Sequence, residues 1–283
     1  MATLCPLCLH VGRDELRPAS SRDYQYLVCR TCGAGQIDPM PDDLRSLYDQ
    51  GYFVDGGSRA GYANYEADEE LHRRTATERI ARLTAALGPG ARPGSLVEIG
   101  SATGFGLLEA QRAGWQAVGV EISEWAGNRA RERGANVVHT LEEVPDAPHD
   151  AVAFFQSLEH LPDPVAALKR SAELLRPGGV LVCETWDARS RTARLTGSRW
   201  QQLSPPSVLW LFTEQAIRAA VEPWGLELTS WRRTGKSVSL ATVVGQSLPD
   251  GSRAKSLLDG RLGRVAIPYP LDDLVTFTAV RRS

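Results

Sequence analysis

The sequence predicts an α/β fold in which helices cover both faces of a mostly parallel sheet, with a small cysteine-rich module at the N-terminus. Short apolar segments alternate with helical segments between residues 97 and 185, as in parallel strands joined by crossover helices. The first of these strands breaks into a glycine-rich turn, and an acid ends the second one. Because such sheets bind ligands at the carboxyl ends of their strands, these features also predict where the functional site lies.

Local signals place the elements in chain order. The helix at residues 66–87 has apolar side chains at helical spacing, and the glycine- and proline-rich residues 88–94 stop it. The helix at residues 163–175 begins at Asp163-Pro164, an N-cap acid followed by proline in the first turn. The remaining helices are expected at residues 107–113, 123–133 and 213–221, and strands at residues 97–99, 118–122, 136–140, 151–156, 179–185, 226–234 and 273–281.

The composition is that of an ordinary soluble globular protein. The 283 residues are 42% hydrophobic and 23% charged, and no apolar run approaches the roughly 18 residues that a membrane span requires. The N-terminus lacks the basic and then apolar pattern of a signal peptide, so we expect a cytoplasmic protein. A net charge of −2 gives no whole-molecule attraction to nucleic acid, which is therefore not an expected partner.

The turn at residues 100–106 predicts a cofactor pocket. Its glycines, at positions 100, 104 and 106, do not follow the G-x-G-x-x-G spacing of dinucleotide-binding loops. Such a turn lets backbone N–H groups at a helix N-terminus approach a polar ligand closely. Glu98 ends the preceding strand, where an acid would repel a phosphate but suits the ammonium group of an amino acid. Glu121 ends the next strand and could accept hydrogen bonds from two ribose hydroxyls, so the pocket would hold a nucleoside cofactor.

This pattern resembles the first motif of the class I S-adenosylmethionine-dependent methyltransferases, acid-x-Gly-x-Gly-x-Gly. The resemblance implies a Rossmann-like sheet and S-adenosylmethionine as cofactor, with the methionine moiety beside the glycine loop and the ribose on Glu121. The departure is Ala102, where the family usually has glycine. Tyr65, just before the first long helix, could contact the cofactor or simply pack the helix start. The expected cofactor-binding residues are Tyr65, Glu98, Gly100, Ser101, Ala102, Gly104, Glu121, Ile122, Gln156 and Ser157.

Two C-x-x-C pairs lie near the N-terminus, separated by residues 9–28. This spacing is typical of zinc ribbons, in which four thiolates form a closed tetrahedral site. We therefore expect a structural zinc ion bound by Cys5, Cys8, Cys29 and Cys32, with redox-active pairs as the alternative. A closed site leaves no open coordination position, so the metal would fold a small module and take no part in catalysis.

The strand at residues 151–156 is followed by the run Glu159-His160-Leu161-Pro162-Asp163-Pro164. This run resembles the E-H-L-P-D-P signature of a methyltransferase subgroup that includes ubiquinone-pathway and sugar O-methyltransferases, and residues 174–181 match the same subgroup. Methylation of a hydroxyl requires a base, and histidine, with an ordinary pKa of about 6.5, suits that role. His160 is the candidate base and Glu159 an orienting or alternative group. The alternative is that His160 only caps a loop and positions the strand end.

We expect the chain to divide into a zinc ribbon at residues 1–38, a linker with N-terminal helices at residues 39–90, and a methyltransferase domain at residues 91–283. An irregular insert at residues 185–212 contains tryptophans among several arginines. It could form a lid over the acceptor, although an ordinary packed loop fits the same composition. Relatives often carry a P-x-H-L motif near here, and the histidine is missing from residues 206–209.

The resemblance extends over nearly the whole chain. A zinc ribbon, a D-L-x-x-L-Y-x-x-x-Y-F linker at residues 43–53 and a closing D-L-V-T-F-T-A-V segment recur in bacterial methyltransferases linked to glycan and secondary-metabolite clusters. This implies methylation of a small molecule, a sugar or a secondary metabolite, including glycosylated or carrier-linked ones. Oxygen is the expected acceptor atom, with nitrogen and carbon left open.

Two other functions stay open at this point. One is a zinc-ribbon ribosomal RNA guanine-N1 methyltransferase, which would need a basic surface that the net charge does not indicate. The other is a non-catalytic module that binds a cofactor or a partner. The intact Gly100, Gly104 and Glu121 argue against it.

Overall fold

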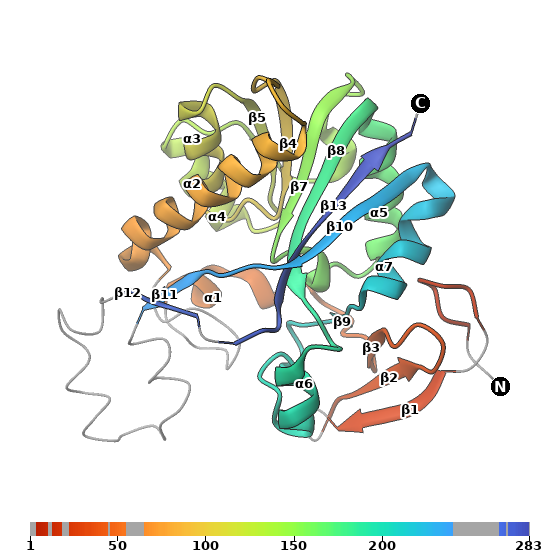
Figure 1. Cartoon of the computed structure of the whole chain (residues 1–283). Helices are drawn as coiled ribbons and strands as arrows, with labels where there is room; N and C mark the ends of the chain where they lie inside the picture. The colour runs from red at the N-terminus through yellow and green to blue at the C-terminus, as the bar shows by residue number, and fades with distance from the viewer. Residues whose placement is uncertain are drawn as a thin grey trace.

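The computed structural model describes residues 4–10, 13–18, 23–44, 46–54, 65–239, 266–269 and 271–282. Its central sheet has seven strands within these residues, in the spatial order β10 (Leu226–Arg233), β13 (Leu274–Arg281), β8 (Leu175–Trp186), β7 (His149–Phe155), β4 (Ser95–Ile99), β5 (Gln116–Val120) and β6 (Val137–Val138) (Figure 1). The strands run in one direction except β13, which is antiparallel to both of its neighbours. The mostly parallel α/β sheet predicted from the sequence is confirmed.

Helices cover both faces of this sheet (Figure 1). One face carries α2 (Glu69–Ala86), α3 (Phe105–Arg112) and α4 (Glu124–Glu132), and the other carries α5 (Pro164–Leu174) and α7 (Glu214–Val221). Successive strand residues alternate between two apolar clusters: Ala153 packs with the first set of helices and Phe154 with the second. Side-chain N-caps begin three of the helices, with Ser123, Asp163 and Thr213 each accepting a backbone N–H.

The N-terminal module forms a second sheet, in the order β1 (Arg13–Pro18), β2 (Gln25–Cys29), β3 (Gly35–Asp38) and β9 (Trp210–Leu211). The fourth strand comes from the insert at residues 185–212, about 170 residues further along the chain than β3. Buried Tyr26 and Ile37 belong to the same apolar cluster as Phe212 and Ile217 of the main domain. The module therefore shares its core with the main domain.

The predicted linker and insert are partly ordered into helices. The linker contains a 3₁₀ turn at Ser46–Tyr48 and α1 (Gln50–Val54), while residues 55–64 lie outside the described residues. The insert contains α6 (Arg191–Thr196), and its Trp200 and Trp210 are buried with their indole N–H groups bonded to Asp273 Oδ2 and to the Leu161 carbonyl.

A small two-stranded sheet, β11 (Ser237–Ser239) with β12 (Ala266–Pro268), completes the described fold. Within the described ranges, no helix combines the length and the apolar character needed to cross a membrane.

Candidate functional site

The glycine turn follows β4 and has the conformation that its glycines permit. Gly100 and Gly104 have φ values of +81° and +85°, in the left-handed region that favours glycine. A Cβ added to Gly100 would lie 2.4 Å from Ser157 Cβ, and one added to Gly104 would lie 2.8 Å from Ala130 Cβ. The turn is thus pressed between the end of β7 and helix α4, and larger residues would displace it. Ser157 also holds the start of the turn, because its hydroxyl donates to the Ile99 carbonyl.

Ala102 also adopts a left-handed conformation, with φ of +47°. Its backbone N–H donates to Glu121 Oε2 at 2.8 Å, which stabilises the conformation that a glycine would adopt with less strain. The departure from the family motif thus keeps the backbone path of the turn and adds a methyl group beside it.

Glu121 lies directly after β5 and is held by the backbone. Besides Ala102 N–H, the Ser123 N–H donates to Glu121 Oε1 at 2.8 Å. Burial raises the pKa of the Glu121 carboxyl, while these two N–H groups act in the opposite direction. The two carboxylate oxygens can together accept about four hydrogen bonds, more than these N–H groups supply, so acceptor capacity remains for a ligand hydroxyl. Ile122, the next residue, is 41% exposed and offers an apolar surface next to this acid.

Glu98 is buried near the C-terminal end of β4, with 5% of its surface exposed. Burial raises the pKa of its carboxyl to about 7, although Arg79 favours the charged form. A Cβ added to Gly106 would lie 2.4 Å from Glu98 Oε1, so the third glycine of the motif makes room for this side chain. The carboxyl is therefore held against the first turn of α3.

Several buried polar atoms around the turn have no hydrogen-bond partner among the described residues: Glu98 Oε2, Ser101 Oγ and Thr103 Oγ1. Buried polar groups without partners are costly, and a cluster of them indicates a bound polar ligand. Together with the open lone pairs of Glu121, they fit a ligand that has hydroxyl groups and an ammonium group. The residues present are thus compatible with S-adenosylmethionine, which carries both kinds of group.

A charged network that the sequence did not predict lies at the carboxyl ends of β7 and β8. The Arg79 guanidinium, from α2, donates to Gln156 Oε1 at 3.0 Å and forms an ion pair with buried Glu184. Gln156 has a φ of +60°, and its Oε1 also accepts from Lys236 Nζ at 3.3 Å. One sequence signal could have indicated this network: Glu184 directly follows the apolar residues 180–183 of β8.

Lys236 packs against two neighbouring aromatic rings. Its Nζ is 4.7 Å from the ring centroid of Trp186 and 5.4 Å from that of Tyr269, at cation–π distance. Burial lowers the pKa of Lys236 to about 8, and nearby Glu184 opposes this. The Tyr269 hydroxyl donates to Asp273 Oδ1 at 3.0 Å, which fixes one of the two rings. The described residues give the Lys236 ammonium no carboxylate partner.

Tyr65 lies at the start of a short 3₁₀ turn, Glu66–Asp68, that leads into α2. Its ring stacks on His72 with centroids 3.9 Å apart and on Phe105 at 6.0 Å. Since Phe105 is the first residue of α3, the stack places Tyr65 next to the glycine turn. Burial lowers the pKa of His72 to about 4, so its ring is neutral at pH 7.

His160 lies in a 3₁₀ turn, Leu158–His160, that follows β7. Its Nδ1 is 2.6 Å from the Ser207 carbonyl, and the Tyr48 ring packs edge-on against the imidazole at 6.2 Å. A carbonyl can only accept a hydrogen bond, so Nδ1 carries a proton and the neutral ring has its lone pair on Nε2. Neighbouring Glu159 is buried and accepts from the Thr185 hydroxyl at 2.9 Å, and burial raises the pKa of its carboxyl.

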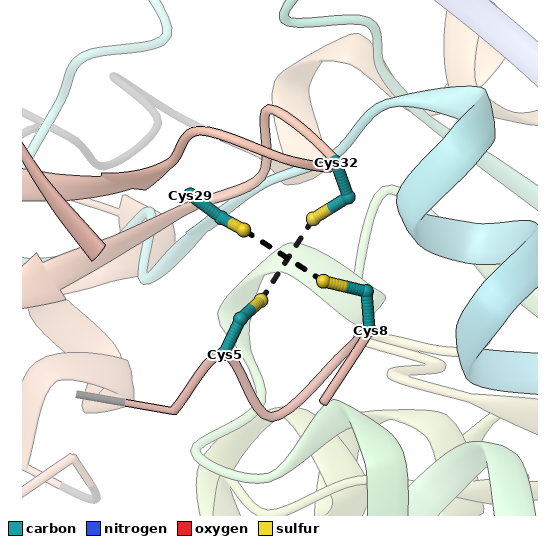
Figure 2. Close-up of side chains that lie close together, drawn as sticks. All are labelled: Cys5, Cys8, Cys29 and Cys32. Atoms are coloured by element: carbon teal, nitrogen blue, oxygen red, sulfur yellow. Dashed lines mark hydrogen bonds between the residues drawn. The ribbon is translucent and has the colours of Figure 1, made fainter. Parts of the chain in front are cut away.

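The four cysteines of the two C-x-x-C pairs converge on one point (Figure 2). Their sulfur atoms all lie within 4.8 Å of one another, with Cys5 Sγ 3.8 Å from Cys32 Sγ and Cys8 Sγ 3.7 Å from Cys29 Sγ. A tetrahedral ion with Zn–S bonds of about 2.3 Å would place its ligands about 3.8 Å apart. A disulfide needs an S–S distance of about 2.0 Å, and all four thiols are free. The donor set is therefore compatible with a zinc ribbon.

Comparison with known proteins identifies the family of the chain. Residues 71–230, more than half of the chain, match the family model described as "Methyltransferase domain". Over 71 residues the chain is 40% identical to a ubiquinone biosynthesis O-methyltransferase of Xylella fastidiosa, covering 23% of this chain and 29% of that protein. Over 145 residues it is 28% identical to the protein of the same name from Alkalilimnicola ehrlichii, covering 43% and 59%. The chain thus spans less than two thirds of the length of these curated relatives.

Among solved structures, magnesium protoporphyrin IX methyltransferase from Synechocystis PCC 6803 with bound S-adenosylmethionine has a similar fold. The TM-score is 0.50 at 17% identity, over 85% of this chain and 98% of that one. Because the family model covers more than half of the residues, the chain belongs to the methyltransferase-domain family. More specifically, the matched residues form a class I S-adenosylmethionine-dependent methyltransferase domain, and a four-cysteine cluster lies N-terminal to it.

Proposed function

We propose that this protein methylates a hydroxyl oxygen of a small molecule, a sugar or a secondary metabolite. S-adenosylmethionine supplies, when bound, a methyl group activated by the sulfonium charge. The chain's own residues must then align the acceptor, exclude water and accept the hydroxyl proton. The curated relatives are named ubiquinone biosynthesis O-methyltransferases, which supports oxygen as the acceptor atom.

The observation that carries this proposal is the hydrogen bond from His160 Nδ1 to the Ser207 carbonyl at 2.6 Å. It leaves Nε2 unprotonated in the neutral ring, which is the state that a general base needs. His160 is only partly buried, so a bound acceptor could reach Nε2. Glu159 supports the same turn through Thr185 and acts in this proposal as a positioning residue.

The cofactor would be held at the ends of β4 and β5. Glu121 would accept hydrogen bonds from the ribose hydroxyls, and Glu98 would pair with the ammonium group. Ile122 would pack against the adenine ring. Gln156, fixed by Arg79, would close the methionine end. We further propose that Cys5, Cys8, Cys29 and Cys32 bind one structural zinc ion, because their spacing fits a closed tetrahedral site.

The test is transfer of a labelled methyl group from S-adenosylmethionine to a panel of catechols, hydroxylated aromatic acids and nucleotide-linked sugars. With an acceptor in hand, His160→Gln should lower kcat by about 100-fold or more and change the affinity for S-adenosylhomocysteine by less than about threefold. His149→Gln, at the opposite end of β7, is the matched control and should keep its turnover. Near-normal turnover of His160→Gln, or no methylation of any panel member by protein that binds S-adenosylhomocysteine, would contradict the proposal.

A further inference from the structure

The segment at residues 207–209, in the insert, is bonded on one side to the cysteine-containing module. The Tyr26 hydroxyl, from β2, donates to the Val208 carbonyl at 2.7 Å, and the Ile37 N–H, from β3, donates to the Leu209 carbonyl at 2.9 Å. Tyr26 is fully buried, and its hydroxyl therefore needs this acceptor. The segment then continues directly into β9, which pairs with β3.

The same segment is bonded on its other side to the turn that carries the proposed base. The Ser207 carbonyl accepts from His160 Nδ1 at 2.6 Å and from the Tyr48 hydroxyl at 3.4 Å. The Leu209 N–H donates to the Glu159 carbonyl at 2.9 Å. Three consecutive residues thus connect β2 and β3 on one side with the turn after β7 on the other.

The contacts continue to the cysteine cluster itself. The Thr213 hydroxyl donates to the Cys32 carbonyl at 2.6 Å and accepts from the Ala216 N–H, so it joins a metal-ligand loop to the start of α7. Gly35 lies against β9, since a Cβ added there would be 2.9 Å from Leu211 Cδ1. The position of the segment at residues 207–209 is therefore set by the folded module.

We propose that the N-terminal module is a positioning element of the active site: through Tyr26 it holds the segment at residues 207–209, whose Ser207 carbonyl keeps the proton of His160 on Nδ1. Tyr26 is the positioning residue, and it acts through Val208 without touching cofactor or acceptor. The inference rests on the proposed role of His160 as the base. It adds that the module determines which nitrogen of that base is available.

The module could instead be an independent unit that binds a partner. Its geometry argues for the positioning role, because the edge of β3 is occupied by β9 and buried Tyr26, Ile37 and Leu7 are packed within the core of the main domain. These buried side chains and the paired β3 edge tie the module to the main domain.

The test is the tautomer of His160, read from ¹⁵N chemical shifts of histidine-labelled protein, with His160→Gln used for assignment. In the wild type we expect the Nδ1–H form to dominate when the ring is neutral. Tyr26→Phe should lower the Nδ1–H fraction. The ring should then show the mixture of Nδ1–H and Nε2–H forms that is expected when Nδ1 has no fixed hydrogen-bond acceptor. Tyr24→Phe is the matched control, because Tyr24 precedes the same strand and its hydroxyl has no partner in the described part of the chain.

A second pair of variants tests the same inference if Tyr26→Phe does not fold. Thr213→Ser keeps both hydrogen bonds of the hydroxyl and should preserve the wild-type tautomer, whereas Thr213→Ala should shift it, each in protein that still binds S-adenosylhomocysteine. An unchanged tautomer in both Tyr26→Phe and Thr213→Ala would overturn the inference. Failure of His160 as the base would instead appear in the turnover of His160→Gln, with the tautomer readout intact.

Discussion

The two sides of the site are built from the chain in different ways. The glycine-loop side, residues 98–106 with Glu121 and Ile122, consists of two short segments that follow neighbouring strands. The β7–β8 side is defined here by Gln156, His160, Glu184, Lys236 and residues 207–209. Its contacts join residues 47 to 80 positions apart, and Arg79 reaches it from 105 positions before Glu184. Local backbone conformation shapes the first side, and long-range packing shapes the second.

In the proposed function, the glycine-loop side binds the cofactor, and the β7–β8 side, apart from Gln156, positions and deprotonates the acceptor. The glycine-loop side needs left-handed residues and two acids, which a few consecutive positions supply. The β7–β8 side depends on the N-terminal module, the insert and the β11–β12 sheet, so its shape can change by substitution far from the loop. We therefore expect the acceptor side to be the variable part of this architecture.

The largest difference between the two sides is expected when the proposed zinc site is disrupted. Cys29→Ala should abolish zinc binding and lower the Tm by about 10 °C or more, because the module shares its core with Trp210 and Phe212. Cys183→Ala is the control; Cys183 is buried outside the cluster, and its loss should lower the Tm by a few degrees with zinc retained. The measurements are metal analysis and thermal unfolding.

The affinity of Cys29→Ala for S-adenosylhomocysteine should stay within about threefold of the wild type, since the glycine loop packs on α4 and β7. A loss of cofactor affinity as large as the loss of metal would show that the two sides are one cooperative unit.

Cofactor affinity should depend on pH through Glu98. Its pKa is raised to about 7 in the cofactor-free protein, and an ammonium ligand requires the charged carboxylate, so binding below that pH must ionise the group. We expect affinity to fall by up to about tenfold per pH unit below about pH 7. Glu98→Gln should bind more weakly at pH 8 and show little pH dependence in calorimetry. An equally steep profile in Glu98→Gln would assign the titration to another group.

The stability of the cofactor-free protein should depend on pH in the opposite direction: cofactor affinity rises with pH, whereas the contribution of Glu98 to stability falls. Because the folded-state pKa of Glu98, about 7, lies above its ordinary value of 4.5, the folded state binds this proton more tightly than the unfolded state. The contribution of Glu98 to the free energy of unfolding is therefore lost as the pH rises from about 4.5 through about 7. Urea unfolding of wild type and Glu98→Gln across this range measures the difference.

The smallest effect is expected at Ala102. Glycine adopts a φ of +47° with less strain, which stabilises the folded state. We expect this stabilisation to exceed the cost of the extra conformational entropy that glycine has in the unfolded chain. Ala102→Gly should raise the Tm by about 1–3 °C and leave cofactor affinity within about twofold. Thermal unfolding measures this, and a lower Tm would mean that the Ala102 methyl group contributes packing that outweighs the strain.

The sequence predicted the central sheet and the glycine-loop side because both depend on local signals. Apolar periodicity, the left-handed glycines and the acids at the ends of β4 and β5 are all readable within residues 95–122, which form one strand, turn, helix and strand unit. The C-x-x-C pairs were equally readable, and the structure brings their four sulfur atoms together.

The contacts on the β7–β8 side could not be predicted from local sequence signals. Arg79 and Glu184 are far apart in the chain and become partners only when α2 packs across the end of β8. The Ser207 carbonyl is a backbone group, and no residue type marks it as the partner of His160. Strand β9 has two residues, too few for a periodic pattern, so its pairing with β3 could not be foreseen.

The central claim, that the ends of β4 and β5 hold S-adenosylmethionine, is tested most directly by calorimetry with S-adenosylhomocysteine on wild type, Glu121→Ala and the exposed control Glu124→Ala. We expect one site in the wild type and in Glu124→Ala, and an affinity at least about 100-fold lower in Glu121→Ala, which loses the ribose acceptor and two backbone hydrogen bonds. Equal affinity in Glu121→Ala and wild type, with both folded, would contradict the claim.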